Sequence, residues 1–597
     1  MSTLVFFLYT NIIIPRPNIT LRSGSHQDEL SQTGKHVHLG AVNHSPVSDW
    51  NSNNEFFEFT RGRFIVDEAG NLRKREVRSD MNRFARVAAD SVGAVRCISI
   101  KKYPDGMFNK AFLMTMDNGR EVVAKVPNLN AGAPHFSTAS EVATMDFWSG
   151  RPGGFLGHRC LAYMHGISRA GSHSVGAEFI IMDKADGVPL SQVWGTLKLP
   201  QKLQVLVAIT RLQKQWLSVS FSHYGSLYYT KDVRPPAGNY YVKDGEVIRD
   251  SEFAIGSATG RDWFDAGRSV LDLETREGHV CRDTYHFRAA ADKFAGASLT
   301  QDLQAVRARE MRAIQSLKPP KQIALFCGPK LYRTGREKKI AALKWYQQVI
   351  DALIPKDTAI TRPYLWHNDL HDDNVFVDPH NPEKITGIID WQSCHISPLF
   401  NHNPDPAFLE WDGLEPETLD LAPMPKLSGL SPNERSAAVH EYTVRNVLLG
   451  WRKLMLSKNP ELYRAVEFRK TAAFGLIFLA HRMFEYGEAH FQSLLVDLKD
   501  TWADLPAVTS DTPFPFNFSE EDIERIKLDS DCAVAGTELV TEVKERLGDL
   551  WPDKGFMEHE RDDEFRAALH EIKDQILEQL AESDEEKAEY ERYWPFE

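Results

Sequence analysis

The chain has 597 residues, of which 42% are hydrophobic and 26% are charged, and its formal net charge is −13. A chain of this length exceeds what one simple core accommodates, so we expect two or three packed units with extensions. The acidic balance argues against nucleic acid or an anionic membrane as the main partner, because both favour basic protein surfaces. A local basic pocket for nucleotide phosphates is compatible with this balance.

The six cysteines are far apart in the sequence and form no CxxC pair. This spacing disfavours a disulfide framework or a zinc site and favours a reducing compartment. The apolar run Leu4–Ile14 is much shorter than the roughly 20 residues that a membrane span needs. We therefore expect no integral membrane segment, and the sequence leaves the oligomeric state open.

Residues 1–55 are expected to form a disordered or targeting extension, with order beginning near Phe56. Leu4–Ile14 resembles the apolar part of a secretory signal, yet no basic residue precedes it. A mitochondrial presequence would have only two basic residues, Arg16 and Arg22, before the first acidic pair. The signal, the presequence and an untargeted extension stay open as interpretations.

Residues 56–182 have the pattern of a small antiparallel sheet with a helix beside it. The turn Asp117-Asn118-Gly119 separates two β-rich runs, and Asn and Gly tolerate the positive φ that a hairpin turn requires. The expected strands are Val95–Ile100, Phe108–Met116, Glu121–Val126 and Glu178–Met182, and the expected helices are Met81–Ala89 and Thr138–Trp148.

Helical patterns dominate the remainder of the chain, so the predicted fold class is α+β. Ser431-Pro-Asn-Glu434 is a capping box with proline at the first helical position, which marks a helix start. Residues 501–597 are interpreted as an acidic helical extension with few apolar side chains to bury. The expected helices are Gln201–Phe221, Arg336–Leu353, Ser431–Leu456, Tyr463–Tyr486 and the tail Met557–Tyr593.

The most informative segment is Leu365–Asp378, which contains the pattern H-x-D-x-x-x-x-N. Transfer of a phosphoryl group from ATP depends mainly on positioning and charge neutralisation. One carboxylate must orient the attacking hydroxyl and accept its proton, and Asp369 fits this role. Asn374 would hold magnesium, while His367 would brace the loop by hydrogen bonding. The cluster His367, Asp369 and His371 also permits a metal-dependent hydrolase, which would need further ligands.

A hairpin is predicted directly after this loop, from strands Asn374–Val377 and Ile385–Ile389. It would bring Asp390 back beside Asn374. Magnesium prefers a few hard oxygen ligands and keeps its remaining waters, which suits an Asp/Asn pair. The sequence therefore predicts a magnesium site at Asn374 and Asp390.

The loop, the hairpin and the second aspartate occur here in the order found in the aminoglycoside phosphotransferase and choline kinase group, which this chain resembles. Within that group, the segments WHNDLHDDNVFVD and ITGIIDWQSCHISPLF are similar to those of the fungal altered inheritance of mitochondria protein 9 family. The resemblance covers residues 56–500. It implies a protein-kinase-like fold of two lobes, 56–182 and 183–500. It also implies ATP and magnesium as cofactors, a small-molecule hydroxyl acceptor and a mitochondrial location.

The same resemblance implies roles in the first lobe. Lys125 matches the lysine that contacts the α- and β-phosphates, and Glu141 matches its ion-pair partner. The loop Tyr103–Asn109, which contains Gly106, would cover the nucleotide. The segment Met182–Lys184 would be the hinge, with Met182 facing the adenine.

Each of these assignments has a plainer alternative. Lys125 would by default be an ordinary lysine at the end of a strand. Thr138-Ala-Ser-Glu141 is a capping box, which would tie the Glu141 carboxylate to backbone at a helix start. The glycine-rich run Gly150–Gly157 follows a predicted helix rather than a strand, so we interpret it as a surface loop.

The sequence departs from its relatives in two places. Its lean nucleotide loop, together with the extensions of the chain, favours a second interpretation, a pseudokinase with a binding or regulatory role. Arg151–Gly166 lacks the strand pattern expected before the hinge, so that edge of the lobe is expected to be distorted. The nucleotide loop has one glycine, Gly106, where relatives have two, and glycine permits close approach to phosphate. The acceptor is not revealed, although an acidic pocket that suits cationic amines would have four candidate contributors, Asp372, Asp373, Glu410 and Asp412.

Overall fold

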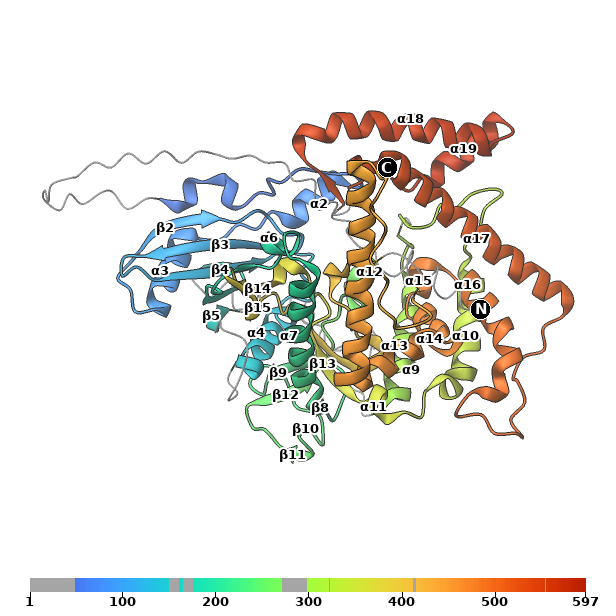
Figure 1. The fold of residues 1–597 in the computed structure, drawn as a ribbon, viewed down its shortest axis with the longest axis horizontal. Coiled ribbons are helices and arrows are strands. Elements are labelled where there is room, and N and C mark those ends of the chain that lie inside the picture. Colours follow the sequence, from blue (N-terminus) through green and yellow to red (C-terminus); the bar gives the residue numbers. More distant parts are fainter. Residues whose placement is uncertain are drawn as a thin grey trace, which may run out of the picture.

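A five-stranded antiparallel sheet forms the small lobe of the computed structural model, which describes residues 49–149, 160–164, 175–270, 298–320, 323–411, 415–552 and 555–596 (Figure 1). In spatial order its strands are β2 (Cys97–Lys102), β3 (Asn109–Met116), β4 (Glu121–Pro127), β6 (Phe179–Asp183) and β5 (Cys160–Met164). The predicted hairpin between β3 and β4 is confirmed, and Gly119 has the positive φ of 78° that such a turn favours. Residues 1–48 of the expected extension and the loop Gly150–Gly157 lie outside the described residues.

The small lobe is held by side chains on one face of this sheet. Strand β3 alternates in burial, which places Phe112 and Met114 against helix α3 (Met81–Ser91). Order begins before Phe56, because short 3-10 turns at Trp50–Ser52 and Asn54–Phe56 precede it. The ring of Phe56 packs edge-on against Phe112, with the ring centroids 5.6 Å apart. The edge strand β5 forms where we expected distortion, although its register with β6 shifts near Cys160.

The large lobe is mainly helical, as predicted, and the α+β two-lobed kinase-like fold is confirmed (Figure 1). The predicted helix Arg336–Leu353 has the same bounds in the structure, whereas the helix predicted from Gln201 ends at Leu217 because Val219–Phe221 pairs as strand β8. The helices are α6 (Ser191–Trp194), α7 (Leu199–Leu217), α9 (Leu299–Ser316), α10 (Arg336–Leu353), α11 (Thr358–Thr361), α12 (Pro432–Lys458), α13 (Pro460–Arg469), α14 (Ala472–Ala480), α15 (Met483–Tyr486) and α16 (Ala489–Leu498).

The prediction of one helix over Tyr463–Tyr486 is wrong, because the chain forms α13, α14 and α15 there. Thr471 caps α14 by accepting a hydrogen bond from Phe474 N at 3.3 Å. Arg482 precedes α15 with φ −124° and ψ 19°, outside helical geometry. This second break turns Arg482 out of the helical stack, which matters for the site below.

Short strands connect the helices of the large lobe. The segment that carries the catalytic motif uses β13 (Pro363–Trp366), which pairs with β16 (His395–Pro398), and β14 (Val375–Asp378), which pairs with β15 (Asn381–Ile388). Strand β7 (Val188–Pro189) adds to β14. The remaining strands are β9 (Ser226–Tyr229), β10 (Tyr241–Lys243), β11 (Glu246–Ile248) and β12 (Phe253–Gly256).

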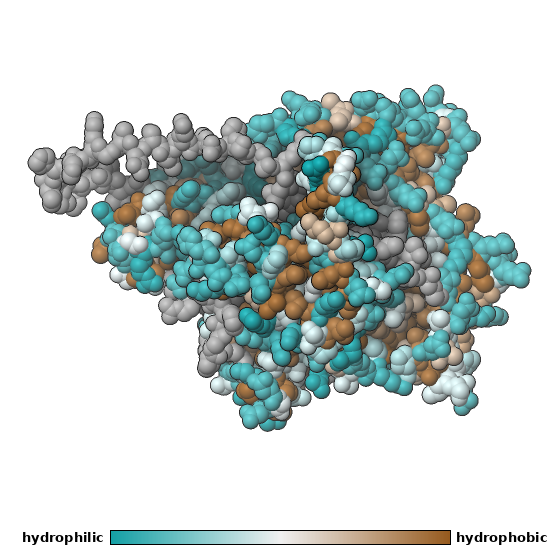
Figure 2. Space-filling view, viewed as in Figure 1, coloured by the Kyte–Doolittle hydropathy of each residue, from teal (hydrophilic) through white to brown (hydrophobic). Residues whose placement is uncertain are grey.

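The C-terminal segment is helical, as predicted, and it also contains a short strand. It contains α17 (Glu520–Leu547), β17 (Phe556–Met557), α18 (Asp562–Leu580) and α19 (Asp584–Tyr593). Its apolar side chains form a separate core with Phe326 and Trp594, and β17 pairs with β1 (Arg63–Phe64) ahead of the small lobe. Figure 2 shows that the outer face of α18 and α19 is mainly hydrophilic. Among the described residues, no helix is both long and apolar enough to cross a membrane.

Candidate active site

The catalytic loop begins where β13 ends, and a buried histidine fastens it to the following hairpin. His367 is 1% exposed, and its Nε2 lies 2.9 Å from the carbonyl oxygen of Ile389. Burial lowers the pKa of His367, so the ring is neutral and can donate this hydrogen bond. Its ring also packs edge-on against Trp391 at 4.8 Å between centroids. These contacts are those expected of a residue that braces the loop.

Asp369 projects from this loop toward solvent and contacts the other histidine of the motif. Its Oδ1 lies 2.8 Å from Nε2 of His371, and 58% of its side chain is exposed. Burial of part of the group opposes ionisation, but the hydrogen bond from His371 lowers the pKa of Asp369 below its usual value. The same hydrogen bond raises the pKa of His371. Asp369 is therefore an ionised, accessible acceptor for a proton at neutral pH.

The predicted hairpin is present and brings Asn374 and Asp390 to the same end of β14 and β15. Asn374 Nδ2 donates to the backbone oxygen of Asp369 at 2.9 Å, which leaves its own Oδ1 available. Ile389 N donates to the backbone oxygen of Asn374 at 3.0 Å, so Asp390 follows directly. Asp390 has a left-handed φ of 61°, a conformation that aspartate tolerates better than most residues.

The oxygens of Asn374 and Asp390 are of the kind that magnesium prefers. Asn374 and Asp390 each present an oxygen, and the Asp390 side chain is 32% exposed. Among the described residues, no group of three or more His, Cys, Asp and Glu side chains is placed to hold a metal. Two protein oxygens suit magnesium, which takes its remaining ligands from phosphates and water.

Lys125 links the two lobes at the base of the cleft. Its Nζ on β4 lies 2.6 Å from Glu141 on helix α4 (Phe136–Ser149) and 2.6 Å from Asp390 on the large lobe. Burial opposes the charge, yet Asp390 and Glu141 together raise the pKa of Lys125 above its usual value. The lysine is not an ordinary strand-end residue, since 90% of its side chain is buried between two carboxylates.

The capping-box interpretation of Glu141 is wrong. Helix α4 begins at Phe136, so Glu141 lies in its second turn rather than at its start. Thr138 uses its hydroxyl to donate to Glu178 at 2.8 Å. The Glu141 carboxylate, 4% exposed, is committed to Lys125. A capping box inferred from spacing alone fails when the helix starts earlier than its pattern indicates.

The loop between β2 and β3 is held in place by a buried acid, Asp105, whose role was not predicted from the sequence. Asp105 is 1% exposed and lies 2.9 Å from Lys110 Nζ and 2.7 Å from Lys102 Nζ. It also accepts from Thr60 N at 3.0 Å, which ties the loop to the segment leading into β1. Gly106 N, next to it, donates to the backbone oxygen of Asn109 at 3.1 Å, closing the loop on itself.

Met182, the predicted hinge residue, lies on β6 opposite Val123 of β4 and is 8% exposed. Lys184, just beyond the strand, pairs with Glu121 at 2.8 Å. This places the predicted hinge at the junction between the sheet and the large lobe.

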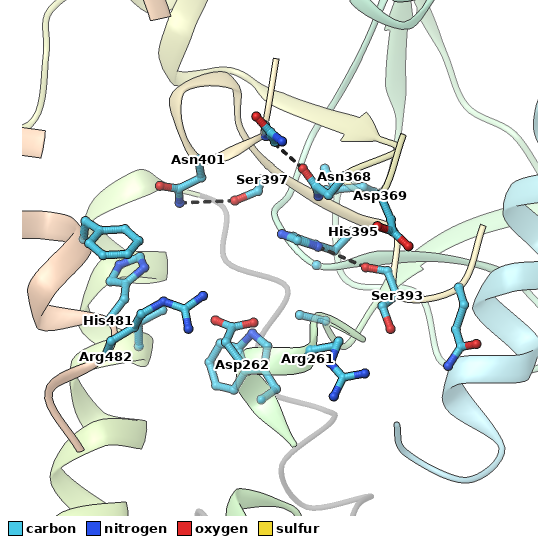
Figure 3. A pocket seen from close by; sticks show the side chains of 18 of the residues that line it. Arg261, Asp262, Asn368, Asp369, Ser393, His395, Ser397, Asn401, His481 and Arg482 are labelled. Carbon is cyan, nitrogen blue, oxygen red and sulfur yellow. Dashed lines mark hydrogen bonds between the residues drawn. The ribbon is translucent and has the colours of Figure 1, made fainter. Parts of the chain in front are cut away.

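A cavity of about 530 Å³ opens beside the catalytic loop (Figure 3). Asp369 and Asp390 both line it, whereas Gly106, Lys125 and Met182 do not. Its far wall comes from α9, from the segment after β12 and from the break between α14 and α15. The lining residues that sequence reasoning missed include Arg261, Asp262, Asp302, His395, His481 and Arg482.

The acids expected to form an acceptor pocket are not at this cavity. Asp372, Asp373 and Glu410 do not line it, and Asp373 and Glu410 are exposed to solvent. Asp412 lies outside the described residues. Asp372 and Asp373 lie in the 3-10 turn Asp372–Asn374, where successive side chains point in different directions. Residues close to the catalytic loop in sequence can therefore face away from the cavity.

The sequence profile of the phosphotransferase enzyme family matches residues 265–401, which contain the catalytic loop and the hairpin. This match confirms the resemblance to the phosphotransferase family over the segment that contains the catalytic motif.

Similar fungal proteins include two groups. A subtelomeric hrmA-associated cluster protein of Aspergillus fumigatus is 30% identical over 340 residues, which span 55% of this chain and 64% of that relative. The mitochondrial altered inheritance of mitochondria protein 9 of Zygosaccharomyces rouxii is 24% identical over 459 residues, 72% of this chain and 69% of the relative.

Among solved structures, an aminoglycoside phosphotransferase APH(4)-Ia aligns with 65% of this chain and 97% of its own, at 13% identity and a TM-score of 0.29.

Proposed function

We propose that the protein transfers the γ-phosphate of ATP to a hydroxyl group of a small molecule. The observation that carries this proposal is the convergence of Lys125 from the small lobe with Asp390 from the large lobe, 2.6 Å apart, beside the exposed Asp369. Phosphoryl transfer needs a phosphate-binding cation, metal ligands and a base in one cleft. Lys125, the pair Asn374 and Asp390, and Asp369 are the candidates for these three groups, and their proximity supports the proposal.

Each residue has a distinct role in this proposal. Asp369 orients the acceptor hydroxyl and takes its proton, and His371 keeps that carboxylate ionised before the reaction. Lys125, held by Glu141, neutralises charge on the α- and β-phosphates. Asn374 and Asp390 would hold magnesium, which when bound supplies charge neutralisation across the phosphates. Gly106 and Met182 would border the nucleotide, and His367 keeps the loop in position.

A pseudokinase is the second candidate function, and one observation favours it. The nucleotide loop has a single glycine, and its Asp105 is fixed in place by two lysines, so the loop has little freedom to adapt to phosphates. In this case the cleft would bind nucleotide to control a partner. For either function we propose a mitochondrial location, because the names of the similar proteins from Zygosaccharomyces rouxii and Saccharomyces cerevisiae describe them as mitochondrial.

Two measurements separate these functions. A thermal shift with millimolar Mg-ATP tests nucleotide binding, because ligand at a hundred times its Kd stabilises by roughly 2.7 kcal/mol. Transfer of labelled γ-phosphate from ATP into a mitochondrial metabolite extract then tests catalysis. We expect both signals, with transfer abolished in Asp369→Asn. A shift without transfer would favour the pseudokinase, and the absence of any shift would remove ATP from the proposal.

A further inference from the structure

Most charged side chains in the cavity beyond the catalytic loop already have partners within the protein. Arg469 donates to the backbone oxygens of Phe400 and His402, which commits its guanidinium to the wall. Each ion pair offsets the charges of its two members, so it adds little net charge to the wall. The ion pairs are Asp262–Arg309 at 2.6 Å, Arg261–Asp265 at 3.0 Å and Asp405–Arg452 at 2.5 Å.

Arg482 differs from these residues. Within the described part of the chain, no ion pair or hydrogen bond engages its guanidinium, whose recorded contact is the ring of Phe478 at 5.5 Å. Figure 3 shows the side chain reaching into the cavity, with the Asp262 carboxylate between it and Arg261 in this view. Asp262 is itself held by Arg309, so it does not serve Arg482 as a dedicated partner.

His481, which precedes Arg482 in the chain, has one ring nitrogen without a hydrogen-bond partner among the described residues. Nε2 of His481 is buried and has no hydrogen-bond partner among the described residues. Burial lowers the pKa of His481 to about 3, so its ring is neutral at physiological pH and does not add positive charge. An unsatisfied buried polar atom is costly unless a ligand completes it. Arg482 and His481 thus present unused hydrogen-bonding groups on one wall.

A second acid that lines this cavity, Asp302, is partly protonated near neutral pH. Asp302 on α9 lines the cavity, and in the described residues no ion pair is formed by its carboxylate. Burial and the neighbouring Asp262 raise the pKa of Asp302 to about 7. Near neutral pH it therefore carries only part of a negative charge. The ionised acid that interacts with Arg482 is Asp262, whose charge is already offset by Arg309 at 2.6 Å.

We infer that the acceptor carries an anionic group, a carboxylate or a phosphate ester, that binds Arg482 while its hydroxyl lies at Asp369. A guanidinium binds either anion through two parallel hydrogen bonds. The inference rests on the proposed phosphotransfer. In that reaction the acceptor oxygen bonds to the γ-phosphorus, the bond to the β-bridging oxygen breaks, ADP leaves and the hydroxyl proton passes to Asp369. A cavity of 530 Å³ has the size of a small-metabolite site.

The test separates acceptors by charge without assuming their identity. A yeast mitochondrial extract is divided at pH 7 into fractions retained by anion exchange, retained by cation exchange and retained by neither. The full-length protein and labelled ATP are added to each. We expect label to enter the anionic fraction. Treating that fraction with phosphatase beforehand distinguishes the two sources, since only a phosphate ester would be lost.

Variants connect the signal to the residue. Arg482→Gln should raise the apparent KM for the anionic fraction roughly ten- to a hundredfold, the loss expected for a charge-assisted hydrogen bond, while the KM for Mg-ATP stays unchanged. Arg482→Lys should keep part of the affinity, and Arg211→Gln on the exposed face of α7 should behave as the wild type. Label entering the cationic or neutral fraction, or an unchanged KM in Arg482→Gln, would overturn the inference. Absence of transfer into every fraction would instead refute the phosphotransferase itself.

Discussion

The proposed nucleotide side and the proposed acceptor side of the cleft differ in whether every buried charge has a partner. On the nucleotide side, Lys125 is held by two carboxylates and Asp105 by two lysines. On the acceptor side, Arg482 has no ion pair in the described part of the chain. Ion pairs between buried side chains hold those side chains in position before any ligand binds. An unpaired charge at a cavity wall is instead available to bind a ligand of opposite charge. We therefore expect the nucleotide side to hold its side chains in fixed positions and the acceptor side to select ligands by their charge.

The largest effect is expected where a paired charge on the nucleotide side loses its partner. Asp105→Asn leaves Lys110, which is 2% exposed, buried without a full counter-charge. Breaking such a pair typically costs about 3–5 kcal/mol, so unfolding by urea should show a matching loss of stability. Asp90→Asn, on the exposed side of α3, is the matched control and should change little. A loss under 1 kcal/mol in Asp105→Asn would mean that the loop is not held by this acid.

Asp369→Asn should abolish most turnover and leave Mg-ATP binding near normal. A group that acts mainly in the transition state typically contributes on the order of 10² or more in rate. Single-turnover transfer of labelled phosphate measures the rate, and titration calorimetry measures nucleotide affinity. If the variant keeps full turnover, Asp369 is not the residue that accepts the proton of the hydroxyl, and the acceptor does not bind beside it.

Asp390→Ala should weaken the magnesium-dependent part of nucleotide binding by roughly tenfold or more, with Asn374→Ala a milder version. The reason is that the change removes a proposed metal oxygen and one of the two anions at Lys125. Affinity for ATP is compared with and without magnesium. Equal magnesium dependence in the wild type and the variant would remove Asp390 from the metal site.

The smallest effect is a pH dependence confined to the acceptor side. Protonation of Asp302 removes negative charge near Arg482, so the affinity for an anionic acceptor should rise a few-fold as pH falls from 8 to 6 through the pKa of about 7. Asp302→Asn should flatten this profile without changing Mg-ATP affinity. The charged and titratable groups around Asp302 are Asp262, Arg309, Tyr224, Tyr346, His395, His481 and Arg482.

Competition assays over this pH range, with the active anionic fraction as ligand, provide the measurement. An affinity that stays constant or rises with pH would contradict the prediction, because it would mean that the charge of Asp302 does not oppose binding of the anion.

The sequence determined the part of the site that is local in the chain. The loop from His367 to Asn374 and the hairpin to Asp390 fold on themselves, so residue spacing alone placed their polar groups together. The hairpin at Asp117–Gly119 was recognisable for the same reason, because the turn residues dictate its backbone. Lys125 and Glu141 could be assigned only through resemblance, and the spacing around Glu141 also suggested a cap that the structure excludes.

Only the tertiary structure decided the acceptor side and the course of the tail. Arg482 faces the cavity because a helix predicted to be continuous breaks beside it, and Asp302 joins it from a helix far away in sequence. Phe556–Met557 pairs with Arg63–Phe64, although neither segment alone has the length or pattern of a strand. Such contacts depend on packing between segments distant in the chain, where short-range periodicity carries no information about which faces meet.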